Sequence, residues 1–320
     1  MLSVLSKSGK TADGVPRKRA RPPLGKRLRA WWEGYDLDED DAGGDDDAGP
    51  FDAEGGDDAE ERRAAGWAPS RLEALQTLFG EGMAQCCDEE AMERLTTPLG
   101  LDETSRVCEI GAGLGGYARY IVKETQAWVT GYEETPELAA AGHQLSVDAG
   151  LGTRAAIEPV DFSAFEPKQK SVDAVVSQDA IFTMADKKAV FSAISGILKP
   201  GGQVMITDYL LSENVVGDSA VAEWAAREPK PVHLITLKQY RELLFGIDLN
   251  VRVCEEITDD YKEWITAAFA DFAARLTGTE ISSELRNWVL EETEHWLTRL
   301  RLMDEGKLRV YRFYGAMPAE

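Results

Sequence analysis

The sequence feature that most restricts the possible folds of this chain is a glycine-rich segment, RVCEIGAGLGG over residues 106–116. It predicts a strand over Arg106–Ile110, a tight glycine turn, and a helix from about Gly115 to Thr125. Glycine has no Cβ, so such a turn lets a bound ligand lie directly against the backbone. A strand, a glycine turn and a helix in that order are typical of an α/β sheet that binds a ligand at its strand ends.

A carboxylate follows this turn at the separation along the sequence that is typical of a nucleoside-binding site. Residues 128–132 predict a second short strand, and Glu133 comes directly after it, about 20 residues beyond the turn. A carboxylate at this place can accept hydrogen bonds from both ribose hydroxyls. The sequence therefore predicts a nucleoside-cofactor site. A strand–helix turn without a ligand would also use glycines, but it would not explain Glu133.

The residue two places before the first glycine discriminates between two cofactors. Gly111, Gly113 and Gly116 fit the dinucleotide pattern. Glu109, however, would repel a pyrophosphate, whereas it could hold the positively charged amino group of a methionyl moiety. We therefore expect S-adenosyl-L-methionine, and an NAD-dependent oxidoreductase is the disfavoured alternative.

Helical and apolar strand patterns alternate along the body of the chain. Alternation of this kind predicts an α/β sheet with parallel strands and both faces covered. We expect strands over 154–159, 172–177, 203–207 and 250–255, and helices over 70–79, 89–95, 136–149, 187–198, 237–245, 260–276 and 282–303. Pro200-Gly201-Gly202 predicts a sharp helix stop before the strand at 203–207. Residues 210–232 break the pattern with charge and prolines, and we expect them to cover the strand ends.

Several of these segments resemble class I S-adenosylmethionine-dependent methyltransferases, from about Phe79 to Phe313. Within that class the chain is most similar to small-molecule N-methyltransferases, especially phosphoethanolamine methyltransferases. The resemblance implies a Rossmann-like, doubly wound sheet of seven strands with an antiparallel last strand, over 308–317, and extra C-terminal helices. It is carried by FGE at 79–81, EIGAGLGG at 109–116, SQDAI at 177–181, LKPGG at 198–202, ITDY at 206–209 and LIT at 234–236.

The resemblance also implies roles for individual residues of the cofactor site. Glu109 and the turn glycines would hold the methionyl part, and Glu133 would hold the ribose. Asp161 and Phe162 would lie at the adenine edge, and Gln178 would lie beside the cofactor. The glycines in question are Gly111, Gly113 and Gly115.

The chain departs from phosphoethanolamine methyltransferases where those enzymes bind their substrate. Their tyrosine after the Phe-Gly-Glu segment is Met83 here, and its partner histidine is Thr183. Their Ser-x-Gly-Gly stretch is replaced by residues 85–88, and an arginine and a tyrosine near the phosphate are replaced by Lys230 and Val232. We therefore expect an intact cofactor site and a substrate other than phosphoethanolamine.

Three residues are candidates for the chemical step. Methyl transfer needs alignment and exclusion of water, and an amine nucleophile must also lose a proton. Asp179 follows the fourth strand, where open α/β sheets bind ligands, and it could orient an ammonium or accept its proton. Its alternative role is a helix N-cap. His233 in the cover segment and the retained Tyr209 are the other two candidates, whereas His143 and His295 are expected to be structural.

These residues favour transfer of a methyl group from S-adenosyl-L-methionine to a small-molecule or lipid-like acceptor, with an amine nitrogen as the leading candidate. The missing tyrosine–histidine pair keeps one alternative open, a cofactor-binding but catalytically lapsed protein that acts as a partner or scaffold. The four cysteines show no metal-ligand spacing, so we expect no metal.

Charge divides the chain into a tail and a body. The 320 residues carry 57 acidic and 35 basic side chains, a net charge of −22. Residues 1–63, a basic block followed by an acidic one, hold too little apolar chain to fold, so we expect a disordered tail and a methyltransferase domain over 64–320.

The same composition bears on partners and location. The acidic body argues against nucleic acid. No apolar run approaches the roughly 18 residues of a membrane span, which favours the cytoplasm. Contact with an anionic membrane through Trp31 and Trp32 is a less favoured alternative to a solvated tail.

Overall fold

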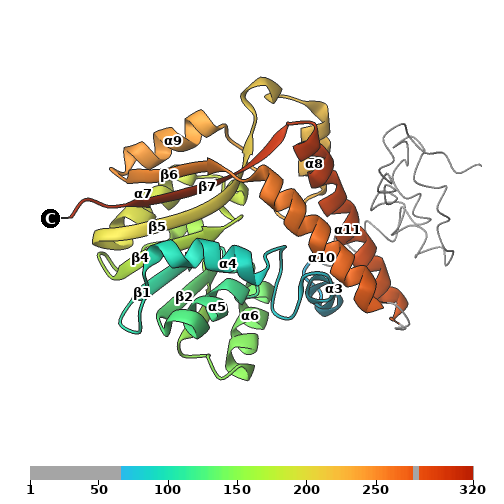
Figure 1. Cartoon of the computed structure of the whole chain (residues 1–320), viewed down its shortest axis with the longest axis horizontal. Helices are drawn as coiled ribbons and strands as arrows, with labels where there is room; N and C mark the ends of the chain where they lie inside the picture. Colours follow the sequence, from blue (N-terminus) through green and yellow to red (C-terminus); the bar gives the residue numbers. More distant parts are fainter. Residues whose placement is uncertain (1–65, 277–280, 320) are drawn as a thin grey trace, which may run out of the picture. The chain divides into compact units, whose positions relative to one another are not determined.

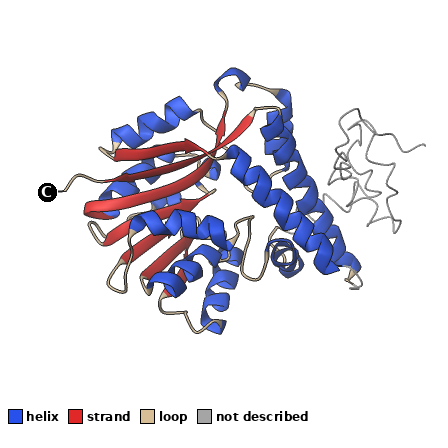
Figure 2. Ribbon diagram, in the orientation of Figure 1, coloured by secondary structure: helices blue, strands red, loops and turns tan. Residues whose placement is uncertain are grey.

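The structure is a computed structural model, and it describes residues 66–276 and 281–319. These residues hold one sheet of seven strands in the order β3-β2-β1-β4-β5-β7-β6, with helices on both faces (Figures 1 and 2). The tail predicted over 1–63, including Trp31 and Trp32, lies outside the described residues. No helix among the described residues is long and apolar enough to cross a membrane.

Five parallel strands form the first part of the sheet. β1 pairs with β2 on one side and with β4 on the other, β2 pairs with β3, and β4 pairs with β5. The strand after β1 is therefore added on one side of the sheet's centre, and the strand after β4 is added on the other side. In sheets of this kind a crevice opens at the carboxyl ends of the two central strands, and ligands bind there. The strands are β1 (Arg106–Ile110), β2 (Trp128–Glu133), β3 (Ala155–Pro159), β4 (Val172–Gln178) and β5 (Leu198–Leu211).

The last strand, β7 (Leu308–Ala316), lies between β5 and β6 (Asn250–Glu256) and runs antiparallel to both. The predicted seven-stranded, doubly wound sheet with an antiparallel last strand is thus confirmed.

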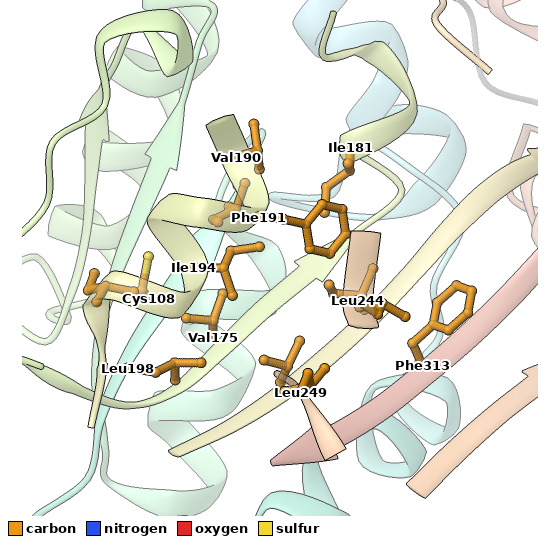
Figure 3. Packing of buried hydrophobic residues seen from close by; sticks show 14 of the residues in the cluster. Cys108, Val175, Ile181, Val190, Phe191, Ile194, Leu198, Leu244, Leu249 and Phe313 are labelled. Atoms are coloured by element: carbon orange, nitrogen blue, oxygen red, sulfur yellow. The ribbon is translucent and has the colours of Figure 1, made fainter. Parts of the chain in front are cut away.

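Alternate residues of the central strands pack on opposite faces of the sheet. On β4, Val175 packs in the cluster with α7 and α9, as Figure 3 shows, whereas Ala174 and Val176 pack in the cluster with α4, α5 and α6. Both faces of the sheet are buried, which explains why these strands are continuously apolar and do not alternate apolar with polar residues. The helices are α4 (Glu89–Thr96), α5 (Gly116–Thr125), α6 (Pro136–Asp148), α7 (Lys187–Ile197) and α9 (Leu237–Gly246).

The remaining helices lie beyond the carboxyl end of the sheet (Figure 1). α3 (Pro69–Phe79) packs against α10 (Thr258–Leu276) and α11 (Ser283–Asp304). The Phe79 ring lies 6.2 Å from that of Phe269 and 5.0 Å from that of Trp296. α10 and α11 are the extra C-terminal helices that the resemblance implies.

Two segments differ from the sequence expectations. α7 ends at Ile197, one residue before the predicted end at Leu198. β5 begins at Leu198 and carries the Pro-Gly-Gly stretch as a bulge, since its pairing with β4 jumps from Leu198 to Gln203. β5 also continues to Leu211, because β7 pairs with it from Gln203 to Leu211. The cover segment contains a helix that the sequence did not predict, α8 (Ser219–Arg227).

Candidate active site

The glycine turn after β1 is held against the end of β2. The backbone N–H groups of Gly111 and Ala112 donate to the Tyr132 carbonyl at 2.8 and 3.0 Å. Gly111 has a φ of +75°, and a Cβ there would lie 2.1 Å from the Cβ of Ala180. Gly113 and Gly115 also have positive φ, and Gly115 is the N-cap of α5. The backbone of this turn is therefore bare where β1 ends.

Glu133, the last residue of β2, lies directly beside this turn. Its Oε2 accepts the Gly113 N–H at 2.9 Å, and its Oε1 accepts the Thr135 N–H at 2.8 Å. The ammonium of Lys230, from the cover segment, lies 2.6 Å from the same Oε1. The carboxylate predicted to hold a ribose is thus oriented by the turn and contacted by the cover.

Glu109 is buried in β1, and its Oε2 has no hydrogen-bond partner among the residues that the structure describes. It lines a small cavity of about 40 Å³ together with Met83, the glycine turn and Gln178. Burial raises the pKa of Glu109 to about 8, although the charge of Arg119 acts in the opposite direction. A cation placed in this cavity would favour the ionised carboxylate.

A larger pocket of about 120 Å³ adjoins this cavity at the carboxyl ends of the parallel strands. The two hollows share Gln85, Gly111, Gly113 and Gln178. Glu133, Asp179 and Tyr209 line the larger one, and α3, α11 and the cover segment close it with Trp67, Leu75, Trp296, Arg299, Glu228 and Lys230. A wider groove of about 620 Å³ lies between α9 and the β6–β7 edge, but it contains none of the predicted site residues.

Asp179 lines the larger pocket directly after β4 and is buried. Its backbone is in the left-handed region at a φ of +50°, which is uncommon for a residue with a side chain. Its carboxylate accepts hydrogen bonds from the Tyr261 hydroxyl, at 2.8 and 2.7 Å from the two oxygens, and from Thr207 Oγ1 at 2.9 Å. Burial raises the pKa of Asp179 to about 6, and these hydrogen bonds partly oppose the rise. Asp179 does not take its alternative role as a helix N-cap, because the N-cap of the helical turn that follows is Ala180.

The Thr-Asp-Tyr segment of β5 supports this wall of the pocket. Thr207 bonds Asp179, and Asp208 accepts the N–H of Phe182 at 3.0 Å, which fixes the short 3-10 helix η4 (Ile181–Thr183). Tyr209 is buried and lines the pocket, and within the described part of the chain its hydroxyl has no hydrogen-bond partner. The wall therefore presents a carboxylate and an unpartnered phenol side by side.

Arg299 of α11 is the cation deepest in this region. It pairs with Glu228, with Nε 3.1 Å from Oε1, and its guanidinium lies 4.5 Å from the centre of the Trp296 ring and 5.4 Å from that of Tyr209. Arg299 and Tyr261 come from the late helices, far from any motif. No local sequence pattern marks them, because only the packing of α10 and α11 brings them to the pocket.

Four predicted site residues do not line either hollow, namely His233, Asp161, Phe162 and Gly115. His233 is exposed, and its N–H donates to the Phe182 carbonyl at 2.8 Å. Asp161 is exposed and bonds Ser163, whereas Phe162 is buried and packs on Phe165 at 5.7 Å. Their assigned roles remain predictions. The other predicted residues, Glu109, Gly111, Gly113, Glu133, Gln178, Asp179 and Tyr209, lie together, and Gly115 forms the adjoining end of the turn.

No group of three or more metal-ligating side chains within residues 66–276 and 281–319 is arranged to hold a metal ion.

Known proteins with similar sequences are mostly N-methyltransferases. The chain is 25% identical over 194 residues to phosphoethanolamine N-methyltransferase of Plasmodium falciparum, covering 60% of this chain and 71% of the relative. It is 29% identical over 226 residues to dimethylglycine N-methyltransferase of Parasynechococcus marenigrum, covering 68% and 78%. Matches to plant phosphoethanolamine N-methyltransferases, such as that of Triticum aestivum, cover 36% of the relative.

Solved structures share the fold. Phosphoethanolamine N-methyltransferase 2 of Haemonchus contortus, in complex with phosphomonomethylethanolamine and S-adenosylhomocysteine, superposes with a TM-score of 0.67 at 20% identity, covering 78% of this chain and 58% of that one. A putative sarcosine dimethylglycine methyltransferase from Galdieria sulphuraria gives 0.64 at 20% identity, covering 78% and 99%.

The family model described as "Methyltransferase domain" matches residues 83–252, which hold the glycine turn, Glu133, Asp179 and Tyr209. Because this match covers more than half of the chain, the protein belongs to the methyltransferase domain family.

Proposed function

We propose that this protein transfers the methyl group of S-adenosylmethionine to the nitrogen of a small amine in the pocket at the carboxyl ends of β1, β2 and β4. One observation carries the proposal. Among the described residues, the unpartnered, buried Glu109 oxygen and the Glu133 carboxylate both lie beside the glycine turn. This arrangement suits a ligand with a cationic amino-acid end and a ribose.

The residues present fit that cofactor. Glu109 would hold the methionyl ammonium, whose charge would return the carboxyl to its ionised form. Glu133 would accept the ribose hydroxyls, and Gly113 would leave room for the ligand against the backbone. When bound, S-adenosylmethionine supplies an electrophilic methyl group on a sulfonium.

Asp179 and Tyr209 would handle the acceptor. An amine attacks only through a free lone pair, so its ammonium form must first lose a proton. With a pKa of about 6, the Asp179 carboxyl is ionised at neutral pH and can accept that proton. The Tyr209 hydroxyl can bind the acceptor, and the rings of Phe182, Tyr209 and Trp296 line the pocket, where they exclude water and favour a cation.

The charges around the pocket disfavour a phosphorylated acceptor. Its two described cations, Lys230 and Arg299, are already paired with Glu133 and Glu228. A buried phosphate would therefore lack a counter-charge, which is costly. We infer that the acceptor is a neutral or cationic amine without a phosphate, in contrast to the acceptors named for the phosphoethanolamine relatives.

Binding and turnover measurements test this proposal. Calorimetry should show binding of S-adenosylhomocysteine but not of NAD, and Glu133→Ala should weaken that binding about tenfold or more, since a hydrogen bond to a charged acceptor contributes about 1.5–3 kcal/mol. Among purified amines, unphosphorylated ones should be methylated faster than phosphoethanolamine. Binding without transfer to any amine would instead support the catalytically lapsed alternative, and binding of NAD alone would overturn the proposal.

A further inference from the structure

We propose that Tyr261 of α10 is a positioning residue that, together with Thr207 of β5, holds the Asp179 carboxylate at the pocket wall as the proton acceptor for the amine. This inference rests on the proposed function and adds a residue that lies in none of the motifs.

The geometry around Asp179 carries the proposal. The Tyr261 hydroxyl lies 2.8 and 2.7 Å from the two carboxylate oxygens and 3.2 Å from Thr207 Oγ1, so one phenol spans the whole carboxylate. Thr207 donates a second hydrogen bond from the neighbouring strand. Asp179 itself is held in the left-handed region, and contacts on two sides keep such a residue in place.

The phenol is held rigidly. Tyr261 is 1% exposed and lies in the first turn of α10. That turn is tied to the sheet, because the N–H of Ile257 donates to the Val310 carbonyl at 2.8 Å. The Tyr261 ring contacts Tyr209 at 6.0 Å and Trp264 at 5.0 Å. A hydroxyl fixed in this way can hold a carboxylate without reorganising during the reaction.

The hydroxyls of Tyr261 and Thr207 favour the ionised form of the Asp179 carboxylate, which is the form that a base needs. Hydrogen bonds to the charged form favour it, whereas burial alone would keep Asp179 protonated and unable to accept a proton. In the proposed step the N–H bond of the ammonium breaks, an O–H bond forms on Asp179, and the electron pair stays on nitrogen.

Other charged and titratable groups also face Asp179. Arg299 of α11 favours its ionised form. Asp208 of β5 also faces Asp179, and a negative charge on one of these carboxylates disfavours a negative charge on the other. The remaining groups are thiols and phenols that burial keeps protonated and uncharged. They are Cys86 and Cys87 before α4, Tyr209 of β5 and Tyr240 of α9.

The unit formed by Tyr261 and Asp179 also bears on the departures from the resembled enzymes. Met83 and Thr183 occupy the positions of their tyrosine and histidine, so neither side chain can take part in proton transfer. Here a phenol reaches the same end of the sheet from a different element, α10.

Titration of Asp179 in single variants tests the inference without any substrate. Carbon-13 NMR of aspartate carboxyls follows each pKa, and Asp179→Asn identifies the resonance. Tyr261→Phe keeps the ring and removes the hydroxyl, so the pKa of Asp179 should rise by about one unit. Thr207→Val should shift it in the same direction. Tyr314→Phe is the matched control, because that hydroxyl also makes two contacts, to Pro98 and Gln203, but lies away from the pocket.

Turnover gives a second readout. The pKa that describes the acid limb of the kcat/KM profile should be higher in Tyr261→Phe, and it should rise together with the pKa of Asp179. The affinity for S-adenosylhomocysteine should stay unchanged. An Asp179 titration in Tyr261→Phe identical to that of Tyr314→Phe would overturn the inference, and Thr207→Val decides it if Tyr261→Phe does not fold. Failure of the proposed function looks different, since the unmodified protein would then bind no S-adenosylhomocysteine or methylate no amine.

Discussion

Glu109, Glu133 and Asp179 are carboxylates at neighbouring strand ends, yet their surroundings assign them different tasks. Glu133 accepts two backbone N–H groups and an ammonium, Asp179 accepts two hydroxyls, and Glu109 accepts nothing from its surroundings through Oε2. Hydrogen bonds hold the carboxylates of Glu133 and Asp179 in place, whereas the open oxygen of Glu109 still has its full capacity to accept a ligand. On this basis Glu109 is the residue most dependent on a bound cation.

The pH dependence of the melting temperature should show that Glu109 is buried without a bound cation. Its folded pKa of about 8 exceeds its ordinary value of 4.5, so between these values the folded state binds more protons than the unfolded state. The contribution of Glu109 is therefore fully present below about pH 4.5 and is lost as pH rises toward 8. Glu109→Gln should flatten this decline in melting temperature without abolishing it, because Asp179 and Asp208 also have raised pKa values. An unchanged pH profile of the melting temperature would contradict the assignment.

The sequence located the residues that belong to a local motif, and it missed those that depend on packing. Glu133 is placed by the strand and turn that precede it, so its position followed from spacing alone. Tyr261 and Arg299 meet the pocket only because α10 and α11 fold back over the strand ends. Conversely, His233 belongs to the cover segment but its side chain is exposed, because the chain there runs along η4.

At the scale of elements, the turn after β1 and the short helix η4 after β4 pack against each other, and this contact explains the first glycine. Gly111→Ala should place a methyl group against Ala180 and also force a side chain into the left-handed region. The strain costs about 1–2 kcal/mol and the overpacking typically about 1–3 kcal/mol more. Urea unfolding should show this loss.

Gly201→Ala is the control for this prediction. Gly201 has nearly the same φ, +74°, but no atom of the described residues outside its immediate neighbours lies within 4 Å of the place that a Cβ would take there, so only the strain applies. Equal losses in the two variants would show that the contact between the turn and η4 is unimportant.

The cover segment also acts on the site through a single contact. Lys230 uses a lone pair of Glu133 that a ribose hydroxyl needs, so Lys230→Met should strengthen binding of S-adenosylhomocysteine by roughly twofold to tenfold, the value of one net hydrogen bond. Lys188→Met, at an exposed position on α7, removes the same charge outside the pocket and should leave affinity unchanged. Weaker binding in Lys230→Met, measured by calorimetry, would mean that Lys230 contacts the cofactor itself.

At the scale of the whole molecule, the order of elements was predictable because the central strands are short, continuously apolar runs and most helices have apolar residues at a helical period. The path of β5 was not, since its bulge and extension depend on pairing with β4 and β7 rather than on its own sequence. The helix α8 was missed for a related reason. It is short, and it is stabilised by the Asp218 cap and by burial of Trp224.

The division of the chain at about residue 64 remains a prediction, and truncation tests it. A protein that starts at Ala64 should melt as cooperatively as the full chain and bind S-adenosylhomocysteine equally well, because a charged tail of low hydrophobicity adds little core. Calorimetric melting of the two proteins measures this. A large drop in melting temperature after truncation would show that the tail stabilises the domain.

The central claim is methyl transfer to an amine nitrogen, and the chemical shift of a transferred methyl group tests it most directly. The protein is incubated with S-adenosylmethionine labelled with carbon-13 in its methyl group and with an extract of small metabolites, and the products are followed by NMR. We expect a new labelled resonance in the N-methyl range that is lost in Asp179→Asn. A label found on oxygen or carbon, or no transfer at all despite cofactor binding, would contradict the account.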